Sequence, residues 1–464
     1  MTPETETTLI DDRRSLALAI RQTIGWLLRA DTSASAMILN IVTQMALVVV
    51  SFGTGVIIAR HLGAAGRGEV AALTLWPMFF SGLFAFGLPT ALVHYSRRFP
   101  KDQASLFSAA LAMLGASSIL MLIVALVIIP RSLHKYDAQV ISWALWLMLV
   151  APQVLLGLLA TAFFQVRGKF AFYNQTRYVP ALLTLVGLLG LLFFHRLTPE
   201  FAALCYLIPP LPMFALALFR VFKMAPPTKV DFRESAGRLL NYGLRAAGID
   251  LLGALSQQVD QVLVIGFLNA STMGTYVVAL SVSRILNVLF TAINMVVSPE
   301  IVGRSPEDMT AYVGRTVRLA IFCGLVGALL MAAVIPFLLP RLYGHEFAAS
   351  VPLVFILMGE LLLSGPTATM AEAFKANGRP GLITIIEAAT LGTSVLLMLT
   401  FIPRLGVIGA ALSLLLASAI RLTAIVSCYR NVVGTRPPHF IINMMDLRYA
   451  WQELSVQIKK TGVS

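Results

Sequence analysis

The hydrophobic pattern of this chain is a series of long apolar runs separated by short polar stretches. Such runs recur along nearly all of the 464 residues. About 20 helical residues, rising ~1.5 Å each, cross the hydrocarbon core of a bilayer. We therefore predict an all-α polytopic membrane protein with twelve transmembrane helices, at residues 36–59, 70–93, 106–130, 139–163, 178–194, 200–219, 246–267, 275–298, 319–339, 348–371, 381–402 and 405–427.

A weak internal repeat accompanies these runs. A shift of 206 residues aligns two segments so that Ala64 meets Ala270 and Gly68 meets Gly274. Each half of the chain then holds six predicted spans in the same orientation, which indicates two six-helix lobes related by an axis along the membrane normal. The matched segments are 56–73 with 262–279 and, at a shift of 210, 160–169 with 370–379.

The polar segments set the expected boundaries of the lobes. Residues 13–29 place apolar side chains on one face and arginines elsewhere, which is typical of an amphipathic helix lying on the membrane. Pro226 and Pro227 are followed by a second amphipathic stretch, and Ser305 with Pro306 and two acids predicts a helix start. The predicted parts are a tail (1–34), an N-lobe (35–219), a linker with an interfacial helix (220–245), a C-lobe (246–429) and a second tail (430–464).

Lysine and arginine are distributed unevenly between alternate loops. With the N-terminus inside, the tails and inside loops hold 26 of the 35 basic residues, and the outside loops hold seven. The other two, Arg284 and Arg421, fall within spans. Because basic loops stay on the cytoplasmic side of a membrane, we predict both termini in the cytoplasm.

Composition excludes several classes of function. Apolar residues make up 58% of the chain and charged residues 12%, against ~45–50% and ~25% in soluble domains. The net charge of +13 is explained by basic loops and anionic headgroups, so no nucleic-acid partner is expected. The three cysteines lack metal-ligand spacing, and no nucleotide-binding or nucleophile motif occurs. We expect no enzyme, cofactor or metal site.

Two neighbouring predicted spans carry polar side chains that a lipid-facing helix would not have. On 246–267, Asp250, Gln257 and Gln261 recur at intervals of seven and four and share one helical face. On 275–298, polar residues step by three and four and form a continuous stripe. Its members are Arg284, Asn287, Thr291, Asn294 and Ser298. Two adjacent helices of this kind predict a polar cavity inside the bundle.

The ionisable residues within spans allow more than one role. An arginine at mid-span costs ~2.5–3.5 kcal/mol on insertion scales, so Arg284 should face protein or water. It can line the cavity toward an anionic substrate, or form a structural ion pair with Asp260 or Asp250, and the two roles can coexist. Glu360 fits a buried proton acceptor and a satisfied structural residue equally well. We expect Arg421 to snorkel to the cytoplasmic end of its span.

Three stretches of the sequence resemble the polysaccharide flippases. These are Wzx-type oligosaccharidyl-lipid translocases of the MOP superfamily, relatives of the MATE multidrug exporters. The stretches are IIARHLGAAGRGEVAAL (57–73), FGLPTALVHYSRR (86–98) and QQVDQVLVIGFLNASTMGTYVVALSVSR (257–284). The resemblance covers roughly residues 36–430 and rests on the order of these motifs within twelve spans.

The resemblance implies a protein that moves undecaprenyl-pyrophosphate-linked oligosaccharides from the inner to the outer leaflet. Alternating access between two lobes, driven by an ion gradient, is the implied mechanism. A pyrophosphate and a hydrated glycan cannot cross hydrocarbon unaided, and cationic and hydrogen-bonding groups would hold them. The residues that we expect to line the substrate cavity are Gln257, Gln261, Arg284, Asn287, Thr291 and Asn294.

The ion-coupling site departs from the relatives. MATE exporters often carry an acid on the first helix, where this chain has none, so coupling would fall to Asp250, Asp260 or Glu360. The implied location is the inner membrane of a bacterium. The implied partners are the lipid-linked oligosaccharide, membrane lipids, a polysaccharide polymerase and glycosyltransferases.

Three alternatives to this function stay open. A cation-coupled exporter of small molecules would have an acidic, aromatic-lined pocket. A flippase for the peptidoglycan precursor typically has two extra spans. A non-transporting membrane scaffold would need no polar stripes.

Overall fold

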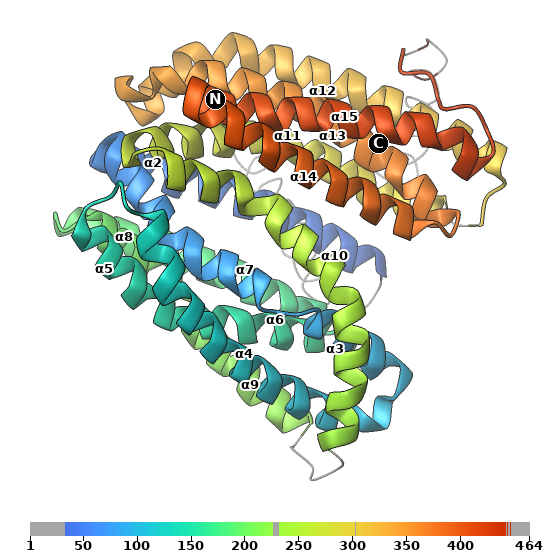
Figure 1. Ribbon diagram of the computed structural model, residues 1–464, viewed down its shortest axis with the longest axis horizontal. Helices are drawn as coiled ribbons and strands as arrows, with labels where there is room; N and C mark the ends of the chain where they lie inside the picture. The colour runs from blue at the N-terminus through green and yellow to red at the C-terminus, as the bar shows by residue number, and fades with distance from the viewer. Residues whose placement is uncertain (1–32, 226–231, 302, 442, 444–445, 447–464) are drawn as a thin grey trace, which may run out of the picture.

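The computed structural model describes residues 33–225, 232–301 and 303–441, together with Asn443 and Asp446. In this part of the chain every regular element is a helix. The helices form two groups that meet at one end of the molecule and diverge toward the other (Figure 1). The amphipathic helix predicted over 13–29 lies outside the described residues.

The first group, the N-lobe, begins with a long helix that bends. This helix, α2 (Ser33–Leu83), changes direction at Gly63, where a φ of 68° interrupts the helical path and favours glycine. The side chain of Glu346 accepts a hydrogen bond from the Ala64 amide just after the bend (3.0 Å). The remaining N-lobe elements are α3 (Leu88–Arg98), η1 (Pro100–Asp102), α4 (Gln103–Ser132), α5 (Ala138–Leu147), η2 (Met148–Val150), α6 (Ala151–Val166), α7 (Phe170–Phe193), α8 (Pro199–Leu207) and α9 (Pro210–Met224).

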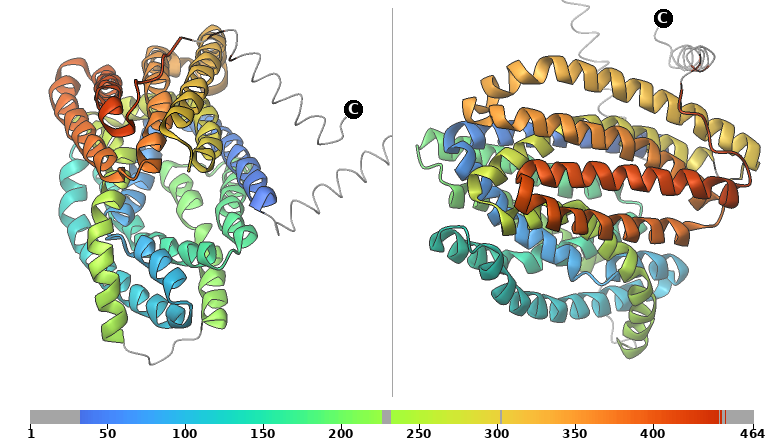
Figure 2. Two further views of the ribbon diagram at one scale, coloured as in Figure 1. Left: turned by 90° about the vertical axis from the view of Figure 1, so that its right-hand side faces the viewer. Right: turned by 45° about the horizontal axis from the view of Figure 1, so that its top comes forward.

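The second group, the C-lobe, consists of long helices that lie roughly alongside one another (Figure 2). They are α11 (Ala270–Glu300), α12 (Pro306–Tyr343), η3 (His345–Ser350), α13 (Val351–Ala376), α14 (Pro380–Leu405) and α15 (Val407–Val433). The helix start predicted at Ser305 is confirmed. Its hydroxyl accepts a hydrogen bond from the Asp308 amide (3.1 Å), and Pro306 lies in the first turn of α12.

One helix, α10 (Phe232–Phe267), packs against both lobes. Its first turns lie on α4, where the hydroxyls of Ser235 and Ser105 share a hydrogen bond (2.7 Å) and Leu239 is fully buried. Residues 232–245, which we predicted as a separate interfacial helix, are therefore the beginning of α10. The N-lobe buries Ser235 and Leu239 of this stretch, whereas Phe232 and Leu240 stay exposed.

The lobes meet most extensively where α2 crosses α11. A Cβ on Gly68 would lie 1.8 Å from the carbonyl oxygen of Ala270, and one on Gly274 would lie 1.9 Å from that of Ala64. Small residues spaced by four let the two helix backbones approach this closely. These are the same four residues that the 206-residue shift aligns. The reciprocal contact therefore has the approximate two-fold symmetry expected of a duplication.

Other matched features support this internal repeat. Pro130 inside α4 and Pro336 inside α12 are 206 residues apart. Gly168 and Gly378, 210 residues apart, follow α6 and α13 with φ values of 66° and 73°. Corresponding helices of the two lobes are thus interrupted and ended in the same way.

Ten helical segments of the described chain are long and apolar enough to cross a membrane. They overlap eleven of the predicted spans, because the first two run through the bend of α2 as one segment. The remaining predicted span lies in α10, which is interrupted by polar residues. The count of twelve spans stays a prediction.

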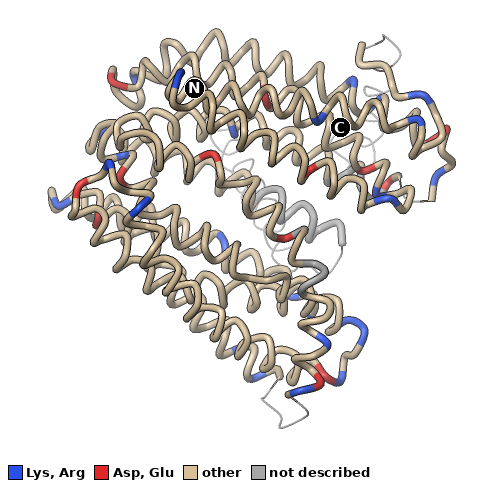
Figure 3. Tube along the Cα trace, viewed as in Figure 1, with Lys and Arg blue, Asp and Glu red and all other residues tan. Residues whose placement is uncertain are grey.

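Charge and exposure agree with a membrane setting. Charged residues gather toward the two ends of the helices and leave the middle largely free of them (Figure 3). The exposed surface there includes Ile123, Val186, Leu329 and Leu396. Lipid contact accounts for so much exposed apolar surface. The chain is a multi-pass membrane protein, and the side on which its termini lie stays a prediction.

Candidate functional site

A cavity of about 630 Å³ lies between α10 and the N-lobe. Its walls come from α2, α3, α6, α7 and α10, and they mix apolar with mostly neutral polar side chains. This volume is within the ~300–1,000 Å³ range typical of ligand pockets. The lining residues with polar side chains are Ser81, Thr90, Thr161, Gln165, Tyr173, Asp250, Gln257 and Gln258.

The break between α2 and α3 shapes one wall of this cavity. Phe86 (φ 48°) and Gly87 (φ 69°) turn the chain between the two helices, and the turn places Thr90 on the cavity wall. On α2 itself, a Cβ at Gly82 would lie 2.8 Å from the Cβ of Ala254. The missing side chain therefore allows α10 to close over the N-lobe.

Asp250 is the one charged residue among the described residues that line the cavity. Its Oδ2 accepts a hydrogen bond from the Thr90 hydroxyl (2.8 Å), which joins α10 to α3. Gln257 lies seven residues further along the same face of α10, about two turns away. The α10 wall therefore offers one carboxylate and an amide to a bound molecule.

Of the six residues that we expected in a substrate cavity, only Gln257 lies on this wall. Gln261 is one turn beyond it and half-buried. Arg284 and Asn287 are exposed on α11, and Thr291 is half-buried one turn further along. In this arrangement the α11 stripe lies apart from the cavity.

The far end of the α11 stripe packs against α13. Asn294 accepts a hydrogen bond from the buried Thr369 hydroxyl (2.7 Å). This contact uses the Asn294 side chain inside the C-lobe, so it contributes to helix packing. The side chain of Ser298 lies outside the described part of the structure.

Asp260 is paired with Tyr276 and not with Arg284. The Tyr276 hydroxyl donates to Asp260 Oδ2 (2.7 Å), and both residues are buried. Asp260 Oδ1 is buried and has no hydrogen-bond partner among the described residues. Arg284 is near enough to act on this pair electrostatically, but no ion pair links it to Asp260 or Asp250 in the described chain. The structural ion pair considered for Arg284 is thus absent from this arrangement.

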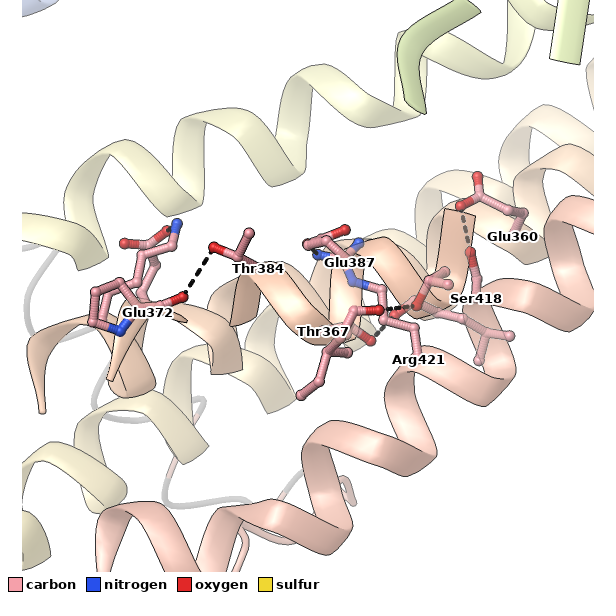
Figure 4. A network of polar contacts seen from close by, with 12 residues as sticks. Glu360, Thr367, Glu372, Thr384, Glu387, Ser418 and Arg421 are labelled. Carbon is pink, nitrogen blue, oxygen red and sulfur yellow. Dashed lines mark hydrogen bonds and ion pairs between the residues drawn. The ribbon is translucent and has the colours of Figure 1, made fainter. Parts of the chain in front are cut away.

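The C-lobe interior holds a separate polar network (Figure 4). Glu360 accepts a hydrogen bond from the Ser418 hydroxyl (2.8 Å), which joins α13 to α15. Arg421 forms an ion pair with Glu387 of α14, and only 17% of its side chain is exposed. Our expectation that Arg421 snorkels is wrong, because a carboxylate on the neighbouring helix holds it within the lobe.

Metal-binding groups are not clustered in the described residues. No group of three or more His, Cys, Asp and Glu side chains there is arranged to hold a metal ion. Cys205, Cys323 and Cys428 are free thiols.

A protein-family comparison matches more than half of the chain. The family model described as polysaccharide biosynthesis protein matches residues 33–303. The chain belongs to this polysaccharide biosynthesis protein family. The match includes the N-lobe, α10 and α11, and therefore every wall of the cavity and the polar stripe. No curated protein sequence matches the chain.

Solved structures of the MOP superfamily share the fold of this polysaccharide biosynthesis protein. The lipid II flippase MurJ in an inward closed conformation has 15% identity, covers 86% of this chain and 88% of its own, and gives a TM-score of 0.71. An inward-facing multidrug resistance MATE transporter has 12% identity, coverages of 85% and 99%, and a TM-score of 0.65. The MATE multidrug transporter DinF-BH, solved as a ligand complex, has 16% identity, coverages of 88% and 97%, and a TM-score of 0.61. The fold is MOP/MATE-like.

Most of the residues that line the cavity could not be recognised from the sequence. Thr90, Gln165 and Tyr173 come from three different N-lobe helices, and no periodic pattern links them. The one sequence pattern that pointed to the cavity is the helical face shared by Asp250 and Gln257. That face indicates a cavity beside α10, but it does not indicate which helices form the opposite wall.

Proposed function

We propose that this protein translocates undecaprenyl-pyrophosphate-linked oligosaccharide repeat units across the bacterial inner membrane for surface polysaccharide assembly. The substrate moves from the inner to the outer leaflet by alternating access between the two lobes. The observation that carries this proposal is membership of the polysaccharide biosynthesis family over the residues that build the cavity and the α11 stripe. The MurJ-like fold supports it.

The chemistry of the cavity suits the hydrated part of such a cargo. Gln165, Gln257 and Thr161 offer hydrogen bonds to sugar hydroxyls, and Tyr173 offers a ring face. These groups replace water that the glycan loses on entering the membrane. The polyprenyl tail remains in lipid, so the cavity has to hold only the glycan and the pyrophosphate.

The internal repeat supports a substrate-binding role for the α11 stripe, which lies apart from the α10 cavity in this arrangement. Three residues that line the cavity, two in α2 and one in the turn after it, have three members of the stripe as counterparts at a shift of 206. We propose that Arg284 binds the pyrophosphate, because a guanidinium donates paired hydrogen bonds to phosphate oxygens. Gln261 extends the polar face of α10 by one turn beyond Gln257. The counterpart pairs are Met78 with Arg284, Ser81 with Asn287 and Ala85 with Thr291.

We assign ion coupling to Asp250, Asp260 and Glu360. Asp250 reaches the cavity directly. The unpartnered Oδ1 of Asp260 is the second candidate, because a bound proton or cation would satisfy it between α10 and α11. Glu360 lies deeper in the C-lobe with Ser418. Binding at Asp250 or Asp260 would couple the charge state of these two carboxylates to the packing of α10, which carries both.

A second candidate function is favoured by one observation. Asp250 is the charged residue of the cavity and Tyr173 lies on the same lining, which suits a cation-coupled exporter of cationic small molecules. Arg284 opposes this candidate, because a cation entering the space beside α11 would meet its charge. The two candidates therefore predict opposite substrate charges.

The proposed function also has a membrane topology and a set of partners. Both termini lie in the cytoplasm, with an N-lobe at 35–219 and a C-lobe at 246–429 joined by residues 220–245. Glycosyltransferases build the cargo before transport, and a polymerase uses it afterwards. The transport step needs no cofactor.

Depletion of the protein in its host tests the proposal. Lipid extracts and surface polysaccharide would be compared before and after depletion, with a wild-type copy restoring both. We expect undecaprenyl-pyrophosphate-linked oligosaccharide to accumulate and surface polymer to be lost. Unchanged glycolipids together with increased sensitivity to cationic dyes would contradict the flippase and support the exporter.

A further inference from the structure

A second cavity, an apolar groove of about 270 Å³, lies on the seam between α2, α11 and α12. Phe52 comes from α2, Val282 and Ile285 come from α11, and the rest of the lining comes from one face of α12 between Leu330 and Tyr343. Apart from the Tyr343 hydroxyl, every lining side chain is a hydrocarbon or a thioether. The groove lies on helices that are candidate membrane spans, so hydrocarbon from the bilayer can reach it.

The length of the groove fits a single lipid chain. Its α12 wall extends over 13 residue steps, which is ~20 Å at ~1.5 Å per residue. One leaflet of a hydrocarbon core is ~15 Å thick, half of the ~30 Å total. A chain lying along α12 would therefore be enclosed for the depth of its own leaflet.

An unpartnered cation marks one end of this groove. Arg67 Nη2 and the Tyr343 hydroxyl each lie 3.8 Å from the point where a Cβ on Gly55 would be. Arg67 is only 9% exposed, and its Nε has no hydrogen-bond partner in the described chain. The nearby carboxylate of Glu346 accepts from the Ala64 amide and forms no ion pair with Arg67.

Two further arginines lie at the same end of the molecule. Arg60 Nη1 donates to the backbone carbonyl of Arg341 (2.5 Å), two residues before Tyr343. Neither side chain forms an ion pair with a described carboxylate. A buried, uncompensated guanidinium is costly, and an anionic phosphate beside it would offset the cost.

We propose that the groove binds one chain of an anionic membrane phospholipid, with the lipid phosphate at the Arg67 end. The apolar lining excludes a soluble anion, and the arginines select a charged headgroup over a zwitterionic one. The bound chain fills the groove between α2, α11 and α12. This site is separate from the α10 cavity. The lipid is expected to bind here whichever cargo the α10 cavity carries.

Native mass spectrometry of the full-length purified protein tests this site without any substitution. The protein would be titrated with phosphatidylglycerol and, separately, with phosphatidylcholine of the same chain lengths. We expect one phosphatidylglycerol to be retained with an affinity at least about tenfold above that of phosphatidylcholine. Equal retention of the two lipids would show only unspecific annular lipid and would overturn the proposal. Displacement of phosphatidylglycerol by undecaprenyl phosphate would overturn the assignment in favour of the carrier lipid.

Two pairs of variants place the bound lipid. Leu338→Trp fills the groove, and Phe337→Trp is its control on an exposed neighbouring position of α12 that does not line the groove. Arg67→Gln removes the cation, and Arg404→Gln, exposed in the last helical turn of α14, is its control. We expect Leu338→Trp and Arg67→Gln to lose the preference for phosphatidylglycerol and both controls to keep it. Retention by all four folded variants would place the lipid elsewhere and contradict the proposal.

Discussion

Gly68 of α2 packs directly against the backbone of Ala270 in α11, so closely that a Cβ on Gly68 would lie 1.8 Å from the Ala270 carbonyl oxygen. The same contact occurs in reverse between Gly274 and Ala64. The two lobes therefore meet through backbone atoms at a point of approximate symmetry. Beyond this point the two groups of helices diverge (Figure 1).

The first prediction concerns this contact. Gly68→Ala introduces a methyl group where backbone must move, so we expect a destabilisation of about 1–3 kcal/mol, typical of overpacking. Thermal unfolding in detergent would show a lower Tm. Gly115→Ala in α4 is the control, because nothing lies within 4 Å of its added Cβ. Equal Tm values for the two variants would show that α2 and α11 do not approach as described.

The second prediction concerns Arg284. Arg284→Ala should abolish transport in a complementation assay while leaving membrane expression intact, because the pyrophosphate loses its cationic partner. Arg284→Lys keeps the charge but loses the paired hydrogen bonds, so it should retain partial activity. Arg404→Ala, exposed in the last helical turn of α14, should behave as wild type. Full complementation by a well-expressed Arg284→Ala protein would refute the role of the α11 stripe.

The third prediction concerns the buried acids. Asp260→Asn keeps a hydrogen-bonding group beside Tyr276 but removes the charge, so we expect a loss of gradient-driven transport of at least about tenfold. Tyr276→Phe keeps the carboxylate and should retain gradient dependence at a lower rate. Initial rates in vesicles with an imposed proton or sodium gradient would measure both. If Asp250→Asn, Asp260→Asn and Glu360→Gln all respond to the gradient as wild type does, the coupling site lies elsewhere.

The fourth prediction concerns the segment that follows α15. Arg318 donates two hydrogen bonds to Asp446 (2.6 and 2.7 Å), with Arg315 3.9 Å away. The Arg318 contact, followed by the Asn443 amide and the charge of the arginines, holds the pKa of the Asp446 carboxyl below its ordinary value. Because the folded-state pKa is lowered, the stabilisation is fully present above the ordinary aspartate pKa of ~3.9 and is lost as the pH falls below it.

Limited proteolysis of the segment after α15 would measure this contact. Asp446→Asn should be cleaved there faster than wild type at pH 7. The difference should shrink as the pH falls below the ordinary aspartate range, because wild type then loses its charge as well. If the difference in cleavage rate between Asp446→Asn and wild type does not change with pH, packing and not the charge of Asp446 holds the segment.

The fold could be predicted well from the sequence, because backbone groups in lipid must be satisfied within a helix. Long apolar runs therefore mark the spans directly, and the aligned pairs Ala64–Ala270 and Gly68–Gly274 already indicated the internal repeat. The beginning of α10 could not be predicted, because an amphipathic face at residues 232–245 suits a membrane surface and a protein surface equally. In the described structure Ser235 and Leu239 are buried where this stretch packs on α4, and Phe232 and Leu240 stay exposed.

The candidate site was predictable only along single helices. The face of α10 that carries Asp250 and Gln257 follows from helical periodicity. Thr90 and Tyr173 could not be added to it, because their meeting depends on how α3 and α7 cross α10. The expectation that Arg421 snorkels was wrong for the same reason. Its partner Glu387 lies on a neighbouring helix, 34 residues earlier in the chain.

The central claim is that the protein itself moves a lipid-linked oligosaccharide across a membrane. Purified protein in vesicles that contain undecaprenyl-pyrophosphate-linked oligosaccharide in one leaflet tests it most directly. An added glycosidase that cannot enter the vesicles would report how fast the glycan reaches the outside. We predict glycan exposure at least about tenfold faster with wild type than with Arg284→Ala or empty vesicles. Equal rates for wild type and empty vesicles, alongside uptake of a cationic dye by the same protein, would contradict the flippase.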